Sequence, residues 1–161
     1  MQSATATTPS FHRDGSKAQP GWIFVFGSNL AGRHGAGAAK AARWEFGAVY
    51  GRGVGRTGNA YGIPTKDGRN GADLKDPRQK LSLDAIRQHV DDFIAYATEH
   101  PELKFFVTRV GCGLAGHLDE EIGPLFAAAP GNCSLPSDWK PYILAKTVQA
   151  LPEFKDENAP C

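Results

Sequence analysis

The segment from Trp22 to Gly47 constrains the fold more than any other part of the chain. It opens with a run of β-prone residues, Trp22-Ile23-Phe24-Val25-Phe26, bounded by glycines, which is typical of a buried strand. A glycine-rich loop follows, and the alanine-rich stretch from Ala36 predicts a helix that Gly47 ends. This order suits a phosphate ligand, because the first turn of a helix offers unpaired N–H groups at the positive end of its dipole.

Length and composition fit one domain. A chain of 161 residues can bury a hydrophobic core, and we expect a flexible segment over residues 1–20 followed by a single domain over residues 21–161. The net charge of +1 gives no general electrostatic signature of a nucleic-acid binder. The sequence shows neither a membrane-spanning run nor a signal peptide, and its three cysteines fit neither a disulfide framework nor a zinc site. We therefore expect a cytoplasmic protein with no metal and no cofactor.

The middle of the chain predicts a loop and a short strand. Residues 51–58 contain the pattern GxGxxG, but no strand precedes it closely and no helix follows, so a flexible surface loop, or a lid, is the better interpretation. Residues 59–66 form a short strand, in which Pro64 indicates an edge or a strand end. A polar loop over residues 67–80 completes this part.

The second half repeats the arrangement of strand and glycine loop. Residues 82–100 show the 3.6-residue period of an amphipathic helix with Ser82 as its N-cap. Residues 104–110 predict a buried strand that leads into the glycine loop at 111–116, after which Asp119 is expected to cap a further helix. Two such loops in one α/β domain suggest a ligand with two adjacent phosphates.

Several polar side chains lie close to these loops. Ser28 and Asn29 follow the first strand, at the end that faces the ligand in open α/β sheets. Asn29 suits a ribose hydroxyl, and it equally suits hydrogen bonds to nearby backbone. Arg33 and His34 either approach a phosphate or face solvent. Cys112 reads as a small buried residue rather than a nucleophile, because the sequence shows no dedicated base for it.

The pairing of GSN-x5-GAGAA with VGCGLAG resembles the macrodomains, the ADP-ribose-binding α/β fold. The branch that removes terminal ADP-ribose from protein or DNA is the most similar, and phage-encoded macro-like proteins also look similar. The matching motifs are Gly35-Ala36-Gly37, Phe46-Gly47, the strand end from Tyr61 to Thr65-Lys66, and the run from Val110 to Leu114. The resemblance covers roughly residues 22–126 and implies a macrodomain-like three-layer α/β/α sandwich with a mixed central sheet.

The resemblance also implies roles for single residues. Asn29 would contact the distal ribose, and the two glycine loops would hold the pyrophosphate through backbone N–H groups. Lys66 would attack the anomeric carbon, which requires a neutral amine and hence a depressed pKa. Where the protein-directed enzymes carry an Asp after GCGL, this chain has Ala115. The candidate catalytic residues are thus Lys66, with His117 and Asp119, and also Glu120, as candidate substitutes for the missing carboxylate.

Three functions remain open at this point. The first is an ADP-ribosyl hydrolase, the second a non-catalytic binder or sequestering protein for ADP-ribose or another NAD-derived nucleotide, and the third an interaction protein that has lost the pocket. Expected partners are ADP-ribose or an ADP-ribosylated macromolecule, and Arg52 and Arg56 favour a nucleic-acid-linked substrate. The candidate ligand-binding residues are Ser28, Asn29, Arg33, His34, Gly35, Ala36, Gly37, Gly111, Cys112, Gly113, Leu114, Ala115 and Gly116.

Overall fold

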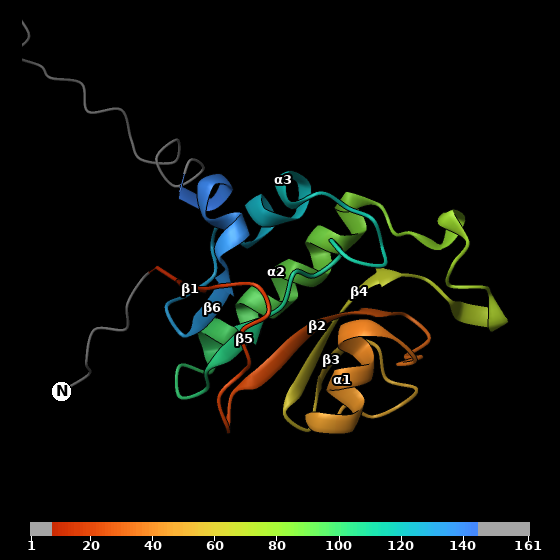
Figure 1. Ribbon diagram of the computed structural model, residues 1–161, viewed down its shortest axis with the longest axis horizontal. Coiled ribbons are helices and arrows are strands. Elements are labelled where there is room, and N and C mark those ends of the chain that lie inside the picture. The colour runs from red at the N-terminus through yellow and green to blue at the C-terminus, as the bar shows by residue number, and fades with distance from the viewer. Residues whose placement is uncertain (1–7, 145–161) are drawn as a thin grey trace, which may run out of the picture.

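The structure is a computed structural model that describes residues 8–144 (Figure 1). Its strands are β1 (Ser10–His12), β2 (Ile23–Asn29), β3 (Gly55–Thr57), β4 (Ala60–Lys66), β5 (Phe105–Val107) and β6 (Cys133–Pro136). Its α-helices are α1 (Gly37–Glu45), α2 (Leu83–Glu99) and α3 (Asp119–Ile122), and residues 140–144 are also helical. Short 3₁₀ turns are η1 (Arg69–Gly71), η2 (Pro77–Gln79), η3 (Gly123–Phe126) and η4 (Ser137–Trp139).

The strands form one mixed sheet. Across the described residues their order is β1-β6-β5-β2-β4-β3, and every neighbouring pair is parallel except β3 with β4. Because β2, β4 and β5 run in the same direction, their carboxyl ends meet at one edge of the sheet. In open α/β sheets this edge is where ligands bind.

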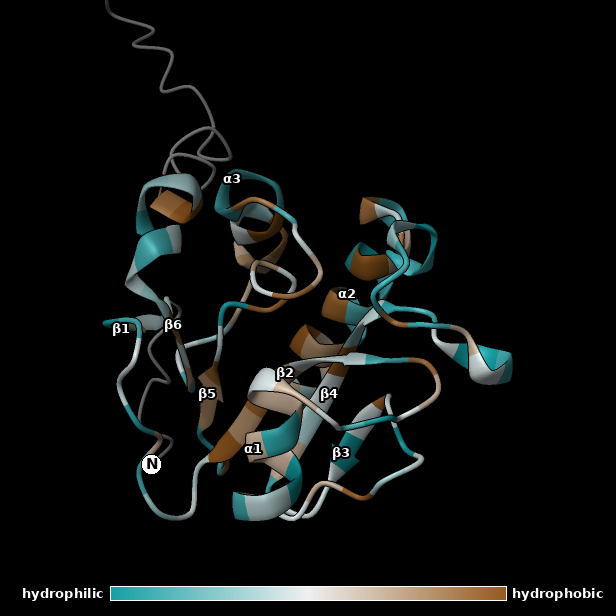
Figure 2. Cartoon of the chain, turned by 45° about the vertical axis from the view of Figure 1, so that its right-hand side comes forward, coloured by the Kyte–Doolittle hydropathy of each residue, from teal (hydrophilic) through white to brown (hydrophobic). Residues whose placement is uncertain are grey.

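Helices cover both faces of this sheet, which makes the fold a three-layer α/β/α sandwich, as predicted. Side chains of β2 alternate between the two layers: Ile23 and Val25 pack with α2, whereas Phe24 and Phe26 pack with α1. A strand buried on both faces needs a continuous apolar run, and this explains the run at the start of β2. Figure 2 shows β2 and β5 as hydrophobic segments between the two helices.

The predicted helices form with the expected ends. The Ser82 hydroxyl accepts a hydrogen bond from the Ala85 N–H at 3.2 Å and so caps α2. Gly47, with φ of 78°, follows the last turn of α1 in the left-handed conformation that glycine adopts readily. The other end of α1 has no side-chain cap, because its N-cap residue is Ala36.

Strand β1 lies inside the segment 1–20 that we predicted to be flexible. It pairs in parallel with β6, with Phe11 opposite Leu135, and His12 Nδ1 lies 2.8 Å from Ser134 Oγ. Three residues carry no periodicity of their own, and the pairing joins the two ends of the domain, so local sequence patterns do not indicate it. Residues 1–7 lie outside the described part of the chain, as do residues 145–161 with Cys161.

Three further predictions differ from the structure in detail. Residues 55–57 form β3 within the loop expected at 51–58, and Gly53 is buried. β4 is an inner strand where β3 pairs with it, and Pro64 lies beyond that pairing, where the outer side of the strand has no β3 partner. The N-cap of α3 is Leu118, not Asp119; Asp119 begins the helix.

Candidate ligand-binding cleft

A cleft of about 1040 Å³ lies at the carboxyl ends of β2, β4 and β5. Its floor includes Phe24 and Phe106, which belong to the core layer on the α1 side, so the cleft opens beside α1. His12 stacks on Phe106 with ring centroids 3.9 Å apart, and this brings the β1 segment to the cleft wall. The volume lies just above the range of about 300–1,000 Å³ that is usual for small-molecule and cofactor pockets.

The two glycine loops meet at this cleft, as the sequence predicted. Gly35, Ala36 and Gly37 are exposed on one side, and the segment from Gly111 to Ala115 lines the other. A Cβ atom built on Gly37 would lie 3.5 Å from Leu114 Cδ1, so the loops approach each other closely. The uncapped first turn of α1 therefore offers its N–H groups to the space between the loops.

The floor of the cleft also requires a glycine, at position 27. A Cβ atom on Gly27 would lie 3.3 Å from the Gly111 nitrogen, closer than most such contacts allow. The end of β2 and the second loop thus approach each other through a residue without a side chain.

The side chains of Asn29 and Arg33 form hydrogen bonds within the protein instead of pointing freely into the cleft opening. The Asn29 amide accepts a hydrogen bond from the Arg33 N–H at 2.9 Å and donates one to the Arg33 carbonyl at 2.7 Å. The Arg33 guanidinium donates to the carbonyl oxygens of Gly68, at 2.7 Å, and Ala72. Of the two interpretations of Asn29, the structure shows the one in which its amide satisfies nearby backbone. Arg33 braces the 67–80 loop instead of facing solvent.

Ser28 is likewise engaged. Its buried hydroxyl donates to the Gly53 carbonyl, which ties the 49–53 turn to the end of β2. A side chain at Gly53 would overlap the carbonyl oxygen of Asn29, so this turn is fitted tightly against the strand. The expectation of a flexible lid is therefore wrong for its Gly53 portion.

Lys66 lines the cleft at the end of β4, opposite Asn29 in the strand register. Its ammonium nitrogen donates a hydrogen bond of 2.7 Å to the carbonyl oxygen of Leu74. Leu74 and Lys75 also line the cleft, so the 67–80 loop forms one of its walls. Neither residue was expected at a site, because the sequence of a polar loop gives no signal of where the loop folds back.

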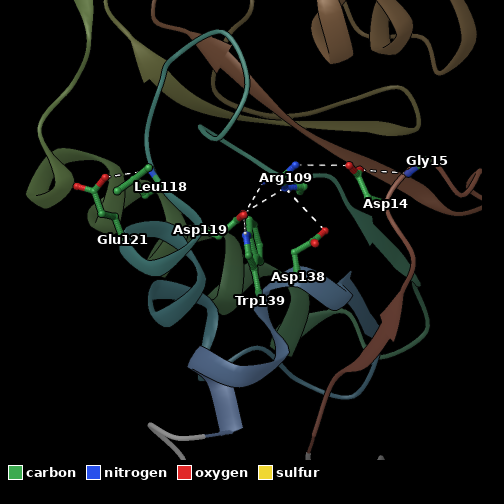
Figure 3. A network of polar contacts seen from close by, with 8 residues as sticks. All are labelled: Asp14, Gly15, Arg109, Leu118, Asp119, Glu121, Asp138 and Trp139. Carbon is green, nitrogen blue, oxygen red and sulfur yellow. Dashed lines mark hydrogen bonds and ion pairs between the residues drawn. The ribbon is translucent and has the colours of Figure 1, made fainter.

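Arg109 forms a charged cluster that the sequence analysis missed (Figure 3). Its guanidinium lies 2.5 Å from Asp119 Oδ2, 3.5 Å from Asp14 Oδ2 and 3.9 Å from Asp138 Oδ2. The Trp139 indole N–H donates to Asp119 at 2.8 Å. Hydrogen bonds from Arg109 lower the pKa of Asp119, and the same contacts raise the pKa of Arg109. The cluster joins the segment after β1, the end of β5, α3 and the last described residues.

This cluster occupies Asp119, which was expected to substitute for the missing catalytic carboxylate. Asp119 serves as the partner of Arg109 and Trp139 and does not line the cleft. Asp14 does line it, beside Arg109. The one available signal for Arg109 was its place at the end of β5, directly before the glycine loop.

The two histidines lie behind the cleft surface. His34 is buried and packs edge-to-face on Phe26, 5.3 Å between ring centroids, so it neither faces solvent nor lines the cleft, and both of its expected positions are wrong. His117 is buried beneath Gly111, whose Cβ position lies 3.5 Å from His117 Cδ2. Burial lowers the pKa of both imidazoles, which favours their neutral forms. Neither ring lines the cleft.

Cys112 lines the cleft and is half-buried, and burial raises the pKa of its thiol to about 12. A thiol with this pKa is a poor nucleophile, in agreement with the sequence analysis.

Among the described residues, no group of three or more His, Cys, Asp or Glu side chains could hold a metal ion, and no helix is long and apolar enough to cross a membrane. The predicted site residues that line the cleft are Ser28, Asn29, Arg33, Gly35, Ala36, Gly37, Lys66, Gly111, Cys112, Gly113, Leu114 and Ala115; those that do not are His34, Gly116, His117 and Asp119.

The similarity of this chain to known proteins is one of fold alone. No protein-family model matches the chain, and no curated protein matches it. A Bacteroides thetaiotaomicron protein, solved as structural genomics target BtR9, aligns with a TM-score of 0.50 and 17% identity over 80% of this chain and 98% of that one. The alphavirus P23pro-zbd structure aligns with a TM-score of 0.54 and 20% identity over 93% of this chain and 25% of that one. This chain therefore corresponds to about a quarter of the viral protein, and at these identities the two similarities show a shared fold.

Proposed function

We propose that this protein is a macrodomain-like binder of ADP-ribose, free or attached to a larger molecule. The observation that carries the proposal is the meeting of the uncapped α1 N-terminus with the Gly111–Ala115 loop across one cleft. Backbone N–H groups of both segments flank the same space, and a pyrophosphate is the anion that such a pair of loops suits. Two of the sequence motifs that resemble macrodomains, Gly35-Ala36-Gly37 and the run from Val110 to Leu114, fall on these two loops.

The charges of the cleft support an anionic ligand. Lys66 and Lys75 line it, and the acidic residue Asp14 lies beside the arginine of the charged cluster. Charge-assisted hydrogen bonds contribute about 1.5–3 kcal/mol each, and micromolar affinity requires about 8 kcal/mol. A handful of contacts to a pyrophosphate is therefore enough for micromolar binding.

Titration calorimetry with free ADP-ribose tests this function, with AMP and ribose 5-phosphate as controls that each carry one phosphate. We expect micromolar or tighter binding of ADP-ribose and at least ten-fold weaker binding of both controls. A folded sample that binds none of the three, or binds AMP as tightly as ADP-ribose, would contradict the two-loop pyrophosphate site.

Hydrolysis of the ADP-ribosyl linkage is the second candidate, and it rests on the position of Lys66 in the cleft wall. In this reaction the neutral amine attacks the anomeric carbon, the bond to the leaving group breaks, and water then releases the sugar from lysine. The amine must first leave the Leu74 carbonyl and lose a proton. Ala115 supplies no carboxylate, and Asp119 is held by Arg109, so the geometry supports binding better than turnover.

Two lysine variants separate the candidates. Lys66→Ala should abolish turnover of an ADP-ribosylated substrate and change ADP-ribose affinity less than about five-fold. Lys75→Ala removes the other lysine of the cleft wall and should leave turnover within a few-fold. Equal turnover in wild type and Lys66→Ala would exclude Lys66 as the nucleophile and leave the binding function untouched.

A further inference from the structure

Two large aromatic side chains on and after α1 lie outside both hydrophobic core clusters. Trp44 is 70% exposed and Tyr50, in the turn after the helix, is 53% exposed. The guanidinium carbon of Arg43 lies 5.1 Å from the centroid of the Trp44 ring and 4.8 Å from that of Tyr50. Both rings are thus held by one cation and leave part of their surface open to solvent.

Cations surround these rings. Lys40 lies one helical turn before Trp44, and both line a shallow groove of about 590 Å³ on α1 together with Glu45. Arg52 is exposed two residues after Tyr50. Against these positive charges and Arg43, Glu45 is the acidic residue of the groove. We call Lys40, Arg43, Trp44, Tyr50 and Arg52 the α1 aromatic surface.

The α1 aromatic surface is continuous with the cleft, because Gly37 lines both the groove and the cleft, and Tyr50 lines the cleft. Arg56, the other arginine of the nearby loop, donates to the Gly58 carbonyl at 3.2 Å and to the Tyr96 hydroxyl at 3.1 Å. It is therefore engaged within the protein. The cations that remain available at this surface are Arg52 in the turn and Lys40 and Arg43 on α1.

We propose that the α1 aromatic surface binds single-stranded nucleic acid. Open aromatic faces offer stacking positions for bases, and the cations Lys40, Arg43 and Arg52 complement the phosphates between them. A duplex hides its base faces, so a single strand fits this combination better. The inference does not depend on the ligand of the cleft, since an unmodified strand would bind the same surface.

Fluorescence anisotropy with a labelled 12-nucleotide oligothymidylate tests the proposal. We expect binding that weakens about 20-fold between 50 and 200 mM salt, because three cations give a slope of about −2 on a single strand. Trp44→Ala should weaken binding about 10-fold through the loss of one stacking contact. Arg43→Ala should weaken it by at least as much, whereas Arg87→Ala, which removes an exposed arginine of α2, should change it less than two-fold.

Several results would overturn the proposal: no binding at 50 mM salt, equal binding by Trp44→Ala, equal losses in Arg43→Ala and Arg87→Ala, or a preference for duplex over single strand. Light scattering that shows a dimer lost in Trp44→Ala would assign the surface to a second copy of the chain instead. ADP-ribose calorimetry on Trp44→Ala separates this test from that of the cleft, because the proposal predicts unchanged ADP-ribose affinity.

Discussion

Glycines gather in two regions of the molecule, the turn around Gly53 and the mouth of the cleft at Gly35 and Gly113, and their surroundings differ. A Cβ atom on Gly53 would overlap the carbonyl oxygen of Asn29, and one on Gly62 would lie 2.5 Å from the Gly53 oxygen. Cβ atoms on Gly35 and Gly113 would meet no heavy atom within 4 Å. The first region needs glycine to fold, whereas the second has free space where a ligand can approach the backbone.

This contrast extends to the side chains around the cleft. Asn29, Arg33 and Lys66 each hydrogen bond to backbone within the protein. Ala36 and Gly35, at the opening, leave backbone N–H groups exposed at the start of α1. At the cleft opening, the groups that are free for a ligand are therefore backbone N–H groups, and this is why binding is better supported than turnover.

Gly53→Ala should produce the largest loss of stability. The added methyl group meets backbone, which cannot rotate away, so we expect the free energy of unfolding to fall by about 3 kcal/mol. Gly35→Ala is the matched control and should leave stability unchanged or raise it by up to about 1 kcal/mol. Urea unfolding of both variants measures this difference; equal stabilities would refute the distinction between the two regions.

Asp119→Asn should have a smaller effect that depends on pH. Arg109 lowers the pKa of Asp119, so the stabilisation exists above the ordinary Asp pKa of about 3.9 and is lost as pH falls below it. We expect the variant to lose about 2 kcal/mol at pH 7 and to differ little from wild type near pH 2. Asp84→Asn, which breaks an exposed pair with Arg87, should cost less than about 1 kcal/mol at either pH.

Ala36→Ser should stabilise the protein and weaken its binding of ADP-ribose. Ala36 has the extended backbone of an N-cap residue but no oxygen to accept a bond from the first turn of α1. Serine supplies one, so we expect a gain of about 1 kcal/mol in urea unfolding. Because the hydroxyl competes for the same N–H groups, ADP-ribose affinity should fall several-fold. A rise in both quantities would mean that the α1 N-terminus does not bind the ligand.

Local patterns were sufficient for the main elements of the fold. Three features show this: the apolar run at β2, the alanine-rich α1 and the 3.6-residue period of α2. In each element, the pattern of buried residues is visible within a short stretch of sequence. Strands β1 and β6 were not predicted, because each is short and their pairing joins segments that are far apart in the sequence. The meeting of the two glycine loops was predictable, since parallel strands bring their carboxyl ends together.

The partners of individual side chains were not predictable in the same way. Asn29 faces two chemically reasonable partners, a ribose or the Arg33 backbone, and only the path of the loop decides between them. Arg109 meets Asp14 and Asp138 from opposite ends of the chain. Such contacts depend on tertiary structure and leave no periodic or spaced pattern in the sequence.

Calorimetry of ADP-ribose with Gly35→Val tests whether the backbone of the first glycine loop holds the ligand. The valine side chain enters open space at the cleft mouth, so we expect at least a ten-fold loss of affinity with the free energy of unfolding unchanged within about 1 kcal/mol. Ala95→Val, on the exposed side of α2, also creates a valine, away from the cleft, and should leave the affinity unchanged. Wild-type affinity in a folded Gly35→Val protein would contradict a ligand held by the backbone of this loop.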